Sequence, residues 1–398
     1  MKKALVLTST FPRWKNDTTP SFVYDLCTHL SGKYNMVVLA PHAYRAESRE
    51  KLGNLKVYRF KYFYPKHQKI AYGAGTLPNV RKSFIAKMQM PFFVISQFNN
   101  ASKLIKSEKI SIIHAHWMIP QGFIGVYLKR KYKIPLIVTI HGSDLFPLKS
   151  TAFRKIQKFV LENADEVTVN SSVAKEEISS RFPLLKTKIS IISMGIDTKL
   201  FSRNNRLKKE YSNQRVILFV GRLNEQKGIE YLIKSMAKIK ESIPNAKILI
   251  IGEGNYRQHL EKITNEIGVA ENTSFLGPIQ NKSLPDYYSL ADVFVLPAST
   301  TKTGTESFGL VLAEAMSCGT CVIGSSSGGI KDIIKNGKNG LIFEEKNHED
   351  LAEKIINVLK NDKLRSRLAE NGRKFAKSNY GWGKISRKFL EVYGRALK

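Results

Sequence analysis

Short apolar segments rich in β-branched residues alternate with longer amphipathic segments along almost the whole chain. This alternation predicts strand–helix–strand units, whose parallel strands form sheets covered by helices on both faces. We expect helices at residues 228–241, 256–267 and 348–359, among others. The expected strands are residues 4–8, 36–40, 55–60, 112–116, 136–140, 166–170, 189–192, 216–220, 247–251, 273–276, 292–296, 320–324 and 340–343.

The alternation is interrupted once, in a polar, basic stretch between residues 194 and 214. A chain of 398 residues is long enough to bury two cores. The two halves therefore predict an α/β fold of two doubly wound, Rossmann-like domains that face each other across a ligand-binding cleft. The expected parts are a domain at 1–195, a linker at 196–214, a second domain at 215–378 and a helical segment at 379–398 that packs back on the first domain.

Cellular location and redox chemistry are constrained by what the sequence contains. No apolar run approaches the roughly 18 residues of a membrane span, and the apolar run after Lys2 and Lys3 is too short for a secretion signal. We therefore expect a cytoplasmic protein. Its cysteines are too few for a disulfide framework, and Cys318 and Cys321 are interpreted as two small buried residues rather than a redox or zinc motif.

The net charge of +31 is concentrated in the first half, where residues 1–200 carry +20. Between Glu50 and Glu108 there are eleven Lys or Arg and no acidic residue, with Tyr and Phe interleaved. Basic and aromatic residues together suit an anionic membrane surface, which we expect the Lys51–Lys106 region to contact. A solvated basic face is the alternative. No nucleic-acid-binding motif accompanies the charge, so we expect no nucleic-acid partner.

Two glutamates stand eight residues apart after the strand expected at residues 292–296. Glu306 lies in the loop before Gly309, and Glu314 lies within an otherwise apolar helix. Open α/β sheets bind ligands at the carboxyl ends of their strands. We expect Glu314 to be partly buried and to need a partner such as a ligand hydroxyl.

A basic loop, residues 221–228, follows the strand expected at 216–220. Gly221 permits a tight turn, while Arg222 and Lys227 suit a pyrophosphate through a planar fork and a compact charge. Residues 307–310 offer backbone N–H groups at a helix start, which also favour an anion. These features together predict a phosphate-bearing ligand.

In combination, these segments resemble the retaining GT-B glycosyltransferases of family 4, the glycosyl transferases group 1, over essentially the whole chain. The motifs that carry the resemblance are Gly221-Arg222, Lys227-Gly228, Glu306-Ser307-Phe308-Gly309, Glu314-Ala315-Met316, Gly252-Glu253-Gly254, Gly277-Pro278, Gly328-Gly329, His114-Ala115-His116-Trp117, His141-Gly142-Ser143-Asp144 and Met194-Gly195-Ile196-Asp197 with Phe201. One departure is residues 17–21, where this family often carries paired glycines, so donor contacts from the first domain are not expected to follow the family pattern.

The resemblance implies roles for individual residues. Arg222 and Lys227 would hold the donor diphosphate, Glu306 the donor sugar and Glu314 the ribose, with His141 beside the reacting carbon. The implied catalytic residues are His141, Arg222, Lys227 and Glu306. The implied donor-binding residues are Gly221, Glu253, Pro278, Ile279, Ser307, Phe308, Gly309, Leu310 and Glu314. The implied acceptor-binding residues are His116 and Asp144.

The histidines of the first half also have structural interpretations. We expect His114 and His116 to point to opposite faces of their strand, so that at least one is structural. His141 is favoured over His116 as the catalytic histidine because it begins a tight polar loop at a strand's carboxyl end. Asp144 could orient an acceptor hydroxyl or cap the following helix.

The resemblance implies transfer of a sugar, with retention, from a nucleotide-sugar donor to a glycan or lipid-linked acceptor in cell-envelope polysaccharide or glycolipid synthesis. UDP is the expected nucleotide. No Asp-x-Asp motif is present, so we expect neither a metal ion nor another cofactor. The protein would be peripheral on the inner face of the cell membrane.

Other functions remain as alternatives. A nucleotide-sugar epimerase of the same fold is one, and a non-catalytic nucleotide-sugar-binding, membrane-docking protein is another. The glycine motifs of NAD-binding dehydrogenases and of P-loop enzymes are absent.

Overall fold

The computed structural model describes residues 1–15, 17, 19–73, 75–204, 206–302 and 304–398. It divides into two compact units, Met1–Gly195 with Ile385–Lys398 and Ile196–Lys384, which we call the N-terminal and C-terminal units and describe separately. Residues 18, 74 and 205, which belong to the segments singled out at 17–21, 51–106 and 196–214, lie outside the described residues.

The N-terminal unit is a twisted sheet with strand order β3-β4-β2-β1-β5-β6-β7-β8. All neighbouring strands are parallel except β3 and β4, which form an antiparallel hairpin at the edge. The strands are β1 (Lys3–Leu7), β2 (Asn35–Pro41), β3 (Arg49–Leu52), β4 (Leu55–Phe60), β5 (Ile112–His116), β6 (Leu136–Ile140), β7 (Glu166–Val169) and β8 (Ile189–Ile191). The helices are α1 (Phe22–Leu30), α2 (Thr76–Lys82), α3 (Phe84–Glu108), α4 (Phe123–Tyr132), α5 (Thr151–Asn163), α6 (Ser172–Arg181) and α14 (Trp382–Ala396).

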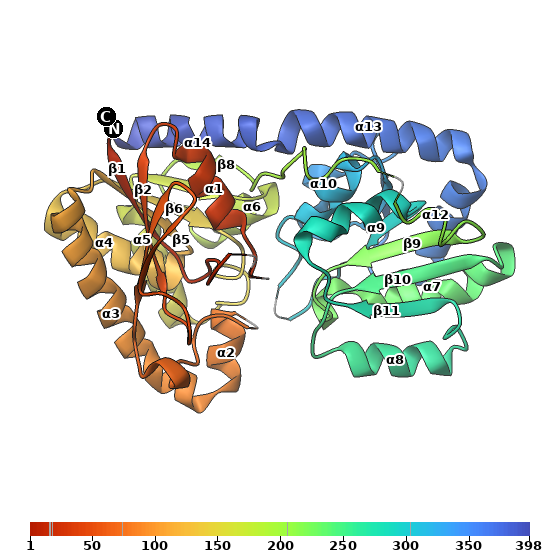
Figure 1. The fold of residues 1–398 in the computed structure, drawn as a ribbon, viewed down its shortest axis with the longest axis horizontal. Helices are drawn as coiled ribbons and strands as arrows, with labels where there is room; N and C mark the ends of the chain where they lie inside the picture. The colour runs from red at the N-terminus through yellow and green to blue at the C-terminus, as the bar shows by residue number, and fades with distance from the viewer. Residues whose placement is uncertain (16, 18, 74, 205, 303) are drawn as a thin grey trace. The chain divides into compact units, whose positions relative to one another are not determined.

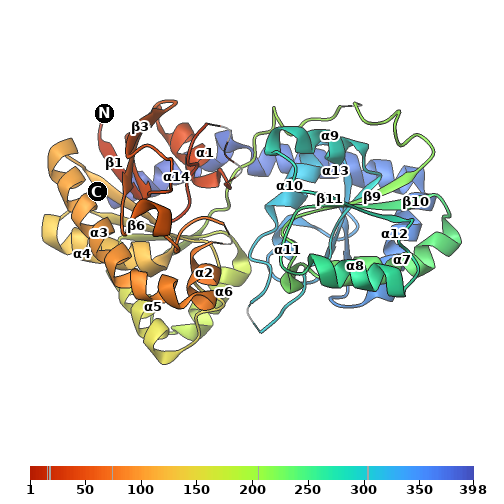
Figure 2. The ribbon, with the colours of Figure 1, turned by 60° about the horizontal axis from the view of Figure 1, so that its bottom comes forward.

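The C-terminal unit is an all-parallel sheet with strand order β11-β10-β9-β12-β13-β14. Helices α7, α8 and α12 pack together on one face, and α9, α10 and α13 pack on the other (Figures 1 and 2). The strands are β9 (Arg215–Val220), β10 (Ala246–Ile251), β11 (Thr273–Gly277), β12 (Val293–Leu296), β13 (Cys321–Ser325) and β14 (Leu341–Phe343). The helices are α7 (Ile229–Ser242), α8 (Arg257–Glu266), α9 (Leu284–Leu290), α10 (Leu310–Ser317), α11 (Ile330–Ile333), α12 (His348–Lys360) and α13 (Asp362–Tyr380).

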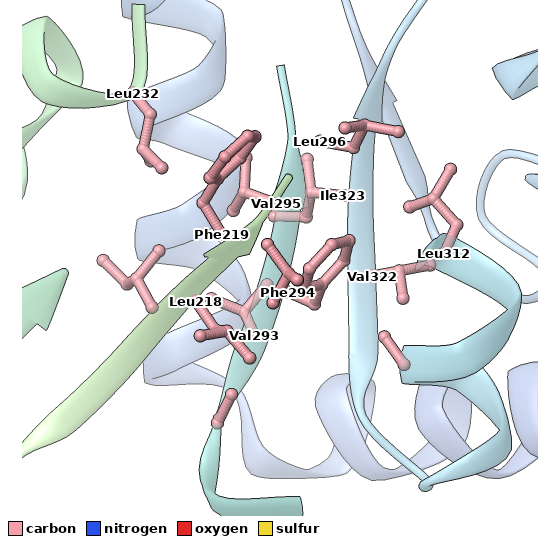
Figure 3. Close-up of a cluster of buried hydrophobic side chains, with 14 of the residues drawn as sticks. Leu218, Phe219, Leu232, Val293, Phe294, Val295, Leu296, Leu312, Val322 and Ile323 are labelled. Carbon is pink, nitrogen blue, oxygen red and sulfur yellow. The ribbon is translucent and has the colours of Figure 1, made fainter. Parts of the chain in front are cut away.

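The core of the C-terminal unit lies on both faces of its central strands. Consecutive residues of β12 are all buried, and their side chains pack alternately toward the two helix layers (Figure 3). Phe219 on β9 and Phe294 on β12 are fully buried. Such continuous apolar runs are typical of strands covered on both sides, and this explains why the sequence pattern predicted them.

All thirteen expected strands are present, with ends that differ by a residue or so. The strand that the sequence analysis missed is β3, whose sequence Arg49-Glu50-Lys51-Leu52 carries no apolar alternation. Its charged residues suit an edge strand, because they discourage pairing with another chain. Cys318 and Cys321 are buried free thiols, as expected. Among the described residues, no helix combines the length and the apolar character needed to cross a membrane.

Helix α14 belongs to the N-terminal unit for most of its length. The Tyr393 hydroxyl is 3.0 Å from Nδ1 of His114 on β5, and Arg395 forms a bidentate ion pair of 2.8 Å with Glu166 on β7. The last residues of the chain therefore complete a unit whose other residues are the first 195.

Candidate functional site

In the C-terminal unit, the winding direction reverses between β9 and β12. These neighbouring strands are followed by two loops, residues 221–228 and 297–309, at the same edge of the sheet. Helices leave toward opposite faces on either side of such a point, so a crevice forms at the carboxyl ends of the strands. Of the residues predicted for the second domain, Arg222, Lys227 and Glu306 lie in these two loops.

The loop after β9 is shaped by its own capping and by contact with β12. The Asn224 side chain accepts a hydrogen bond of 3.2 Å from the Lys227 backbone N–H, which closes a short 3₁₀ turn. Gly228 follows with φ +61°, and a Cβ there would lie 1.9 Å from the Pro297 carbonyl oxygen. Only glycine allows this approach, which fixes Lys227 beside the loop after β12.

The loop after β10 supports the loop after β9 through backbone contact. A Cβ on Gly252 would lie 1.8 Å from the Gly221 carbonyl oxygen, and a Cβ on Gly254 would lie 2.1 Å from that of Leu223. The Leu223 N–H donates to the carbonyl of Glu253 at 3.0 Å. The glycines of this motif therefore let two strand-end loops pack backbone to backbone.

Lys227 and Glu306 form the central contact of the site. The Lys227 ammonium lies 2.5 Å from Oε2 of Glu306, and the side chains are only 17% and 12% exposed. Burial raises the pKa of Glu306, but the Lys227 charge and hydrogen bond, the Phe308 N–H and the Arg222 charge outweigh it, so the pKa lies below its ordinary value. The carboxylate is therefore ionised and paired at neutral pH.

The backbone around Glu306 is clamped from two sides. The Gln226 side-chain amide donates to the Thr305 carbonyl. On the other side, the Gly329 N–H donates to the Glu306 carbonyl at 2.9 Å, and a Cβ on Gly328 would lie 2.0 Å from that oxygen. Contacts within the protein thus hold the loop geometry, which is the preorganisation that binding and catalytic sites require.

Glu314 lies on α10, the helix that follows the loop at residues 297–309, and is partly buried as expected. Its partner within the protein is the Tyr288 hydroxyl, which donates to Oε2 at 2.9 Å. Burial raises the pKa of Glu314 to about 7, although the Tyr288 hydrogen bond opposes this shift. The sequence analysis foresaw the need for a partner and missed that Tyr288, on α9, supplies one.

The remaining predicted donor residues differ in how they are placed. Arg222 is exposed next to the paired Lys227. Glu253 is exposed and forms ion pairs with Arg257 rather than facing the loop after β9, and Pro278 is exposed while Ile279 packs on the core. Ser307 and Leu310 are half-buried and Gly309 is buried at the start of α10.

Phe308 is buried, with its ring 5.4 Å from that of Tyr380, so only its backbone is available to a ligand.

The predicted residues of the N-terminal unit gather where β5 and β6 end. The half-buried ring of His141 lies 5.0 Å from that of Phe22 and 4.7 Å from that of Trp117. It shares a hydrogen bond of 3.0 Å with His116, whose Nδ1 faces Nε2 of His141. Burial lowers the pKa of His141 to about 3, so the imidazole is neutral at physiological pH and can donate or accept hydrogen bonds without carrying a positive charge.

The expectation that His114 and His116 point to opposite faces is wrong. Residues two apart on a strand share a face, and the two ring centroids lie 4.4 Å apart. Both side chains are fully buried, and burial lowers the pKa of each. His116 therefore supports the His141 ring through their shared hydrogen bond. Because the side chain of His116 is fully buried, it has no exposed atom for the acceptor contact that we predicted.

Asp144 is buried, and its two carboxylate oxygens accept from the backbone N–H groups of Met118 at 2.6 Å and His141 at 3.2 Å. Burial raises the pKa of Asp144 to about 6, and these hydrogen bonds oppose the shift. Asp144 does not cap the following helix, because the N-cap of α5 is Ser150. Instead, Asp144 ties the loops after β5 and β6 together and so holds the His141 backbone.

Among the described residues, no group of three or more His, Cys, Asp or Glu side chains has an arrangement that could hold a metal ion. The positive groups of the site are therefore Arg222, Lys227 and the backbone N–H groups near Phe308. Together they can receive an anion, while Glu306 and Glu314 can accept hydrogen bonds from hydroxyl groups.

Models of glycosyltransferase families match both halves of the chain. The model of glycosyl transferases group 1 matches residues 202–375, and the model of glycosyltransferase family 4 matches residues 20–200. An uncharacterized glycosyltransferase of Methanocaldococcus jannaschii is 32% identical over 323 residues, covering 77% of this chain and 80% of the relative.

Solved structures resemble the whole chain. Sucrose-phosphate synthase from Thermosynechococcus elongatus superposes with a TM-score of 0.81 at 22% identity, over 99% of each chain. HepE of Anabaena, solved in complex with UDP, gives a TM-score of 0.71 at 18% identity, over 99% of this chain and 100% of HepE. Identities this low show a shared fold.

Proposed function

Since the chain belongs to the group 1, family 4 glycosyltransferases and has their GT-B fold, we propose that this hexosyltransferase uses a UDP-sugar and transfers with retention. The acceptor would be a hydroxyl of a glycan or lipid-linked molecule. The observation that carries the proposal is the buried Lys227–Glu306 pair, beside the exposed Arg222. The pair lies in the C-terminal unit, where the winding direction reverses between β9 and β12.

The pair suits a ligand that carries both a diphosphate and a hydroxyl-bearing sugar. Lys227 and Arg222 would contact the diphosphate, whose negative charge grows as the sugar bond breaks. Glu306 would accept hydrogen bonds from the sugar hydroxyls, and Glu314 from the ribose. Because Glu306 keeps Lys227 in place without a ligand, little reorganisation is needed when the donor binds.

The same groups support the proposal that transfer proceeds with retention and without a metal ion. The acceptor hydroxyl would attack from the face of the departing diphosphate and give its proton to that leaving group. Arg222, Lys227 and the backbone N–H groups from Phe308 onward would carry the electrostatic stabilisation that a metal ion supplies in other enzymes. His141, neutral and held by His116, would orient groups next to the reacting carbon.

A role in cell-envelope polysaccharide or glycolipid synthesis, at the inner face of the membrane, is supported by the basic and aromatic character of residues 51–106. A nucleotide-sugar epimerase and a non-catalytic binding protein are the alternatives. They differ from a transferase in one measurable respect: only a transferase releases nucleoside diphosphate in proportion to the acceptor added.

The test begins with a screen of nucleotide sugars for thermal stabilisation of the protein, followed by nucleoside diphosphate release with glycan and lipid-linked acceptors. Lys227→Met and Glu306→Gln should each abolish release. Lys238→Met, which removes two exposed ion pairs in the same unit, should retain it. Wild-type turnover in the two site variants would refute the assignment. The anomeric configuration of the product tests retention, and a chelator tests metal independence.

A further inference from the structure

The N-terminal unit exposes a row of large apolar side chains along α3. Four of the most exposed follow one another at spacings of four, four and three residues, and Ile85 lies three residues before Met88, so all five lie on one side of the helix. They are Phe84, Ile85, Met88, Phe92 and Ile95, which are 74%, 57%, 59%, 54% and 57% exposed. Large apolar side chains that gather on a monomer surface mark a binding surface.

Two neighbouring features extend this row. Phe63 and Tyr64, 41% and 75% exposed, follow β4, and the Phe63 ring lies 6.5 Å from that of Phe92. At Ile95 the row meets an apolar cavity of about 150 Å³ lined by residues of α3 and α4. Its lining is Val94, Ile95, Phe98, Phe123, Ile124 and Tyr127. We call the row, Phe63, Tyr64 and this cavity the α3 surface.

The charge around the α3 surface has one sign. No acidic residue occurs between Glu50 and Glu108, and Glu108 itself is bound by Lys3, Lys56 and Tyr58. The exposed basic residues in the first turns of α3, just before it, or next to Phe63 and Tyr64 in sequence are Lys61, Lys66, Arg81, Lys82 and Lys87, and Lys103 and Lys106 are exposed near the end of α3. The surface therefore combines apolar side chains with uncompensated positive charge.

We propose that the α3 surface docks on an anionic lipid bilayer, with the apolar row inserted at the boundary between headgroups and acyl chains. An apolar face flanked by Lys and Arg is the arrangement that binds membrane interfaces, and each basic residue near such a surface adds attraction to anionic lipid. The narrow cavity beside Ile95 is lined only by apolar and aromatic residues and has room for part of one acyl chain. This docking is independent of the transfer reaction.

The experiment is sedimentation of the full chain with phosphatidylglycerol-containing vesicles, compared with phosphatidylcholine vesicles. Wild type should sediment with the former, and salt should weaken this binding without abolishing it, because the apolar part is not screened. Met88→Glu and Phe92→Glu should each lower the partition coefficient by tenfold or more. Lys87→Glu should lower it by at least about fivefold, the equivalent of one basic side chain.

Matched controls lie at the other end of the same sheet. Leu184, 90% exposed after α6, and Lys186, also exposed, belong to the segment between α6 and β8, whereas α3 packs on β1, β2 and β4. Leu184→Glu and Lys186→Glu should bind vesicles as the wild type does. Thermal stabilisation by the donor nucleotide should be equal in all five variants, which separates lost docking from lost folding.

A fluorescence measurement distinguishes insertion into a membrane from contact with a protein partner. In Phe92→Trp the new indole should be quenched by brominated lipids and shift its emission to shorter wavelength on anionic vesicles only. Binding that is equal for both kinds of vesicle, or absent from both, would overturn the proposal. So would a wild-type dimer that Met88→Glu converts to a monomer without any change in lipid binding.

Discussion

Replacing Lys227 by methionine should destabilise the protein in a way that depends on pH. Glu306 would remain buried without its main partner, and removing one member of a buried pair costs about 3–5 kcal/mol. The carboxyl group can avoid this cost by binding a proton. From its ordinary pKa of 4.5, protonation at about pH 7 costs about 3.4 kcal/mol, and at about pH 5 only about 0.7 kcal/mol.

The loss of unfolding free energy in Lys227→Met should therefore be capped near 3 kcal/mol at about pH 7 and fall below about 1 kcal/mol at about pH 5. The sign follows from the pKa of Glu306. In the wild type this pKa lies below the ordinary value, so the pair contributes stability that is lost as pH falls through the folded-state value. In the variant the pKa rises above the ordinary value, so the destabilisation grows as pH increases.

Urea unfolding of wild type, Lys227→Met and the double variant Lys227→Met/Glu306→Gln measures these differences. The double variant removes the ionisable group, so its stability relative to the wild type should vary with pH only through loss of the native pair, and it should recover most of the neutral-pH loss. An equal penalty at both pH values, or no recovery in the double variant, would refute the reasoning. Transfer activity should be absent from both variants in every case, which separates the stability argument from the functional one.

Three further results are expected. Because the pKa of Glu314 is raised to about 7, UDP affinity measured by calorimetry should increase as pH rises through about 7. The variant Glu314→Gln should flatten this dependence. An unchanged pH profile in the variant would remove Glu314 from the ribose site. Gly254→Ala places a Cβ 2.1 Å from the Leu223 carbonyl oxygen, so it should lower the melting temperature by several degrees and weaken donor binding, while Gly383→Ala, with no atom within 4 Å, should do neither. His116→Phe should change kcat and its pH profile more than KM for the donor, because it removes the hydrogen bond that orients His141; equal losses in the two parameters and in stability would indicate only a packing role.

Much of the fold could be predicted because the buried strands are continuous apolar runs, as in β12 and β9. The strand β3 could not, since three of its four residues carry charge and it pairs only at an edge. The relative orientation of the His114 and His116 side chains was predicted wrongly, because residues two apart on a strand were taken to face opposite sides of the sheet.

The candidate site was predicted only as separate residues. Lys227 and Glu306 are 79 positions apart in the sequence, and no local pattern indicates that they pair. The same is true of Tyr288 and Glu314, which come from different helices. The glycine motifs predicted more than tight turns. At several of these glycines another backbone segment lies so close that no residue with a Cβ atom would fit.

The packing of α14 has a consequence for biosynthesis. During translation the first 195 residues leave the ribosome long before the last fourteen, so His114 and Glu166 wait for Tyr393 and Arg395 until synthesis ends. The C-terminal unit, in contrast, is complete at Lys384. Because these contacts belong to the N-terminal unit, we expect a fragment ending at residue 195 to need the α14 peptide, added in trans, to become fully protected from proteases.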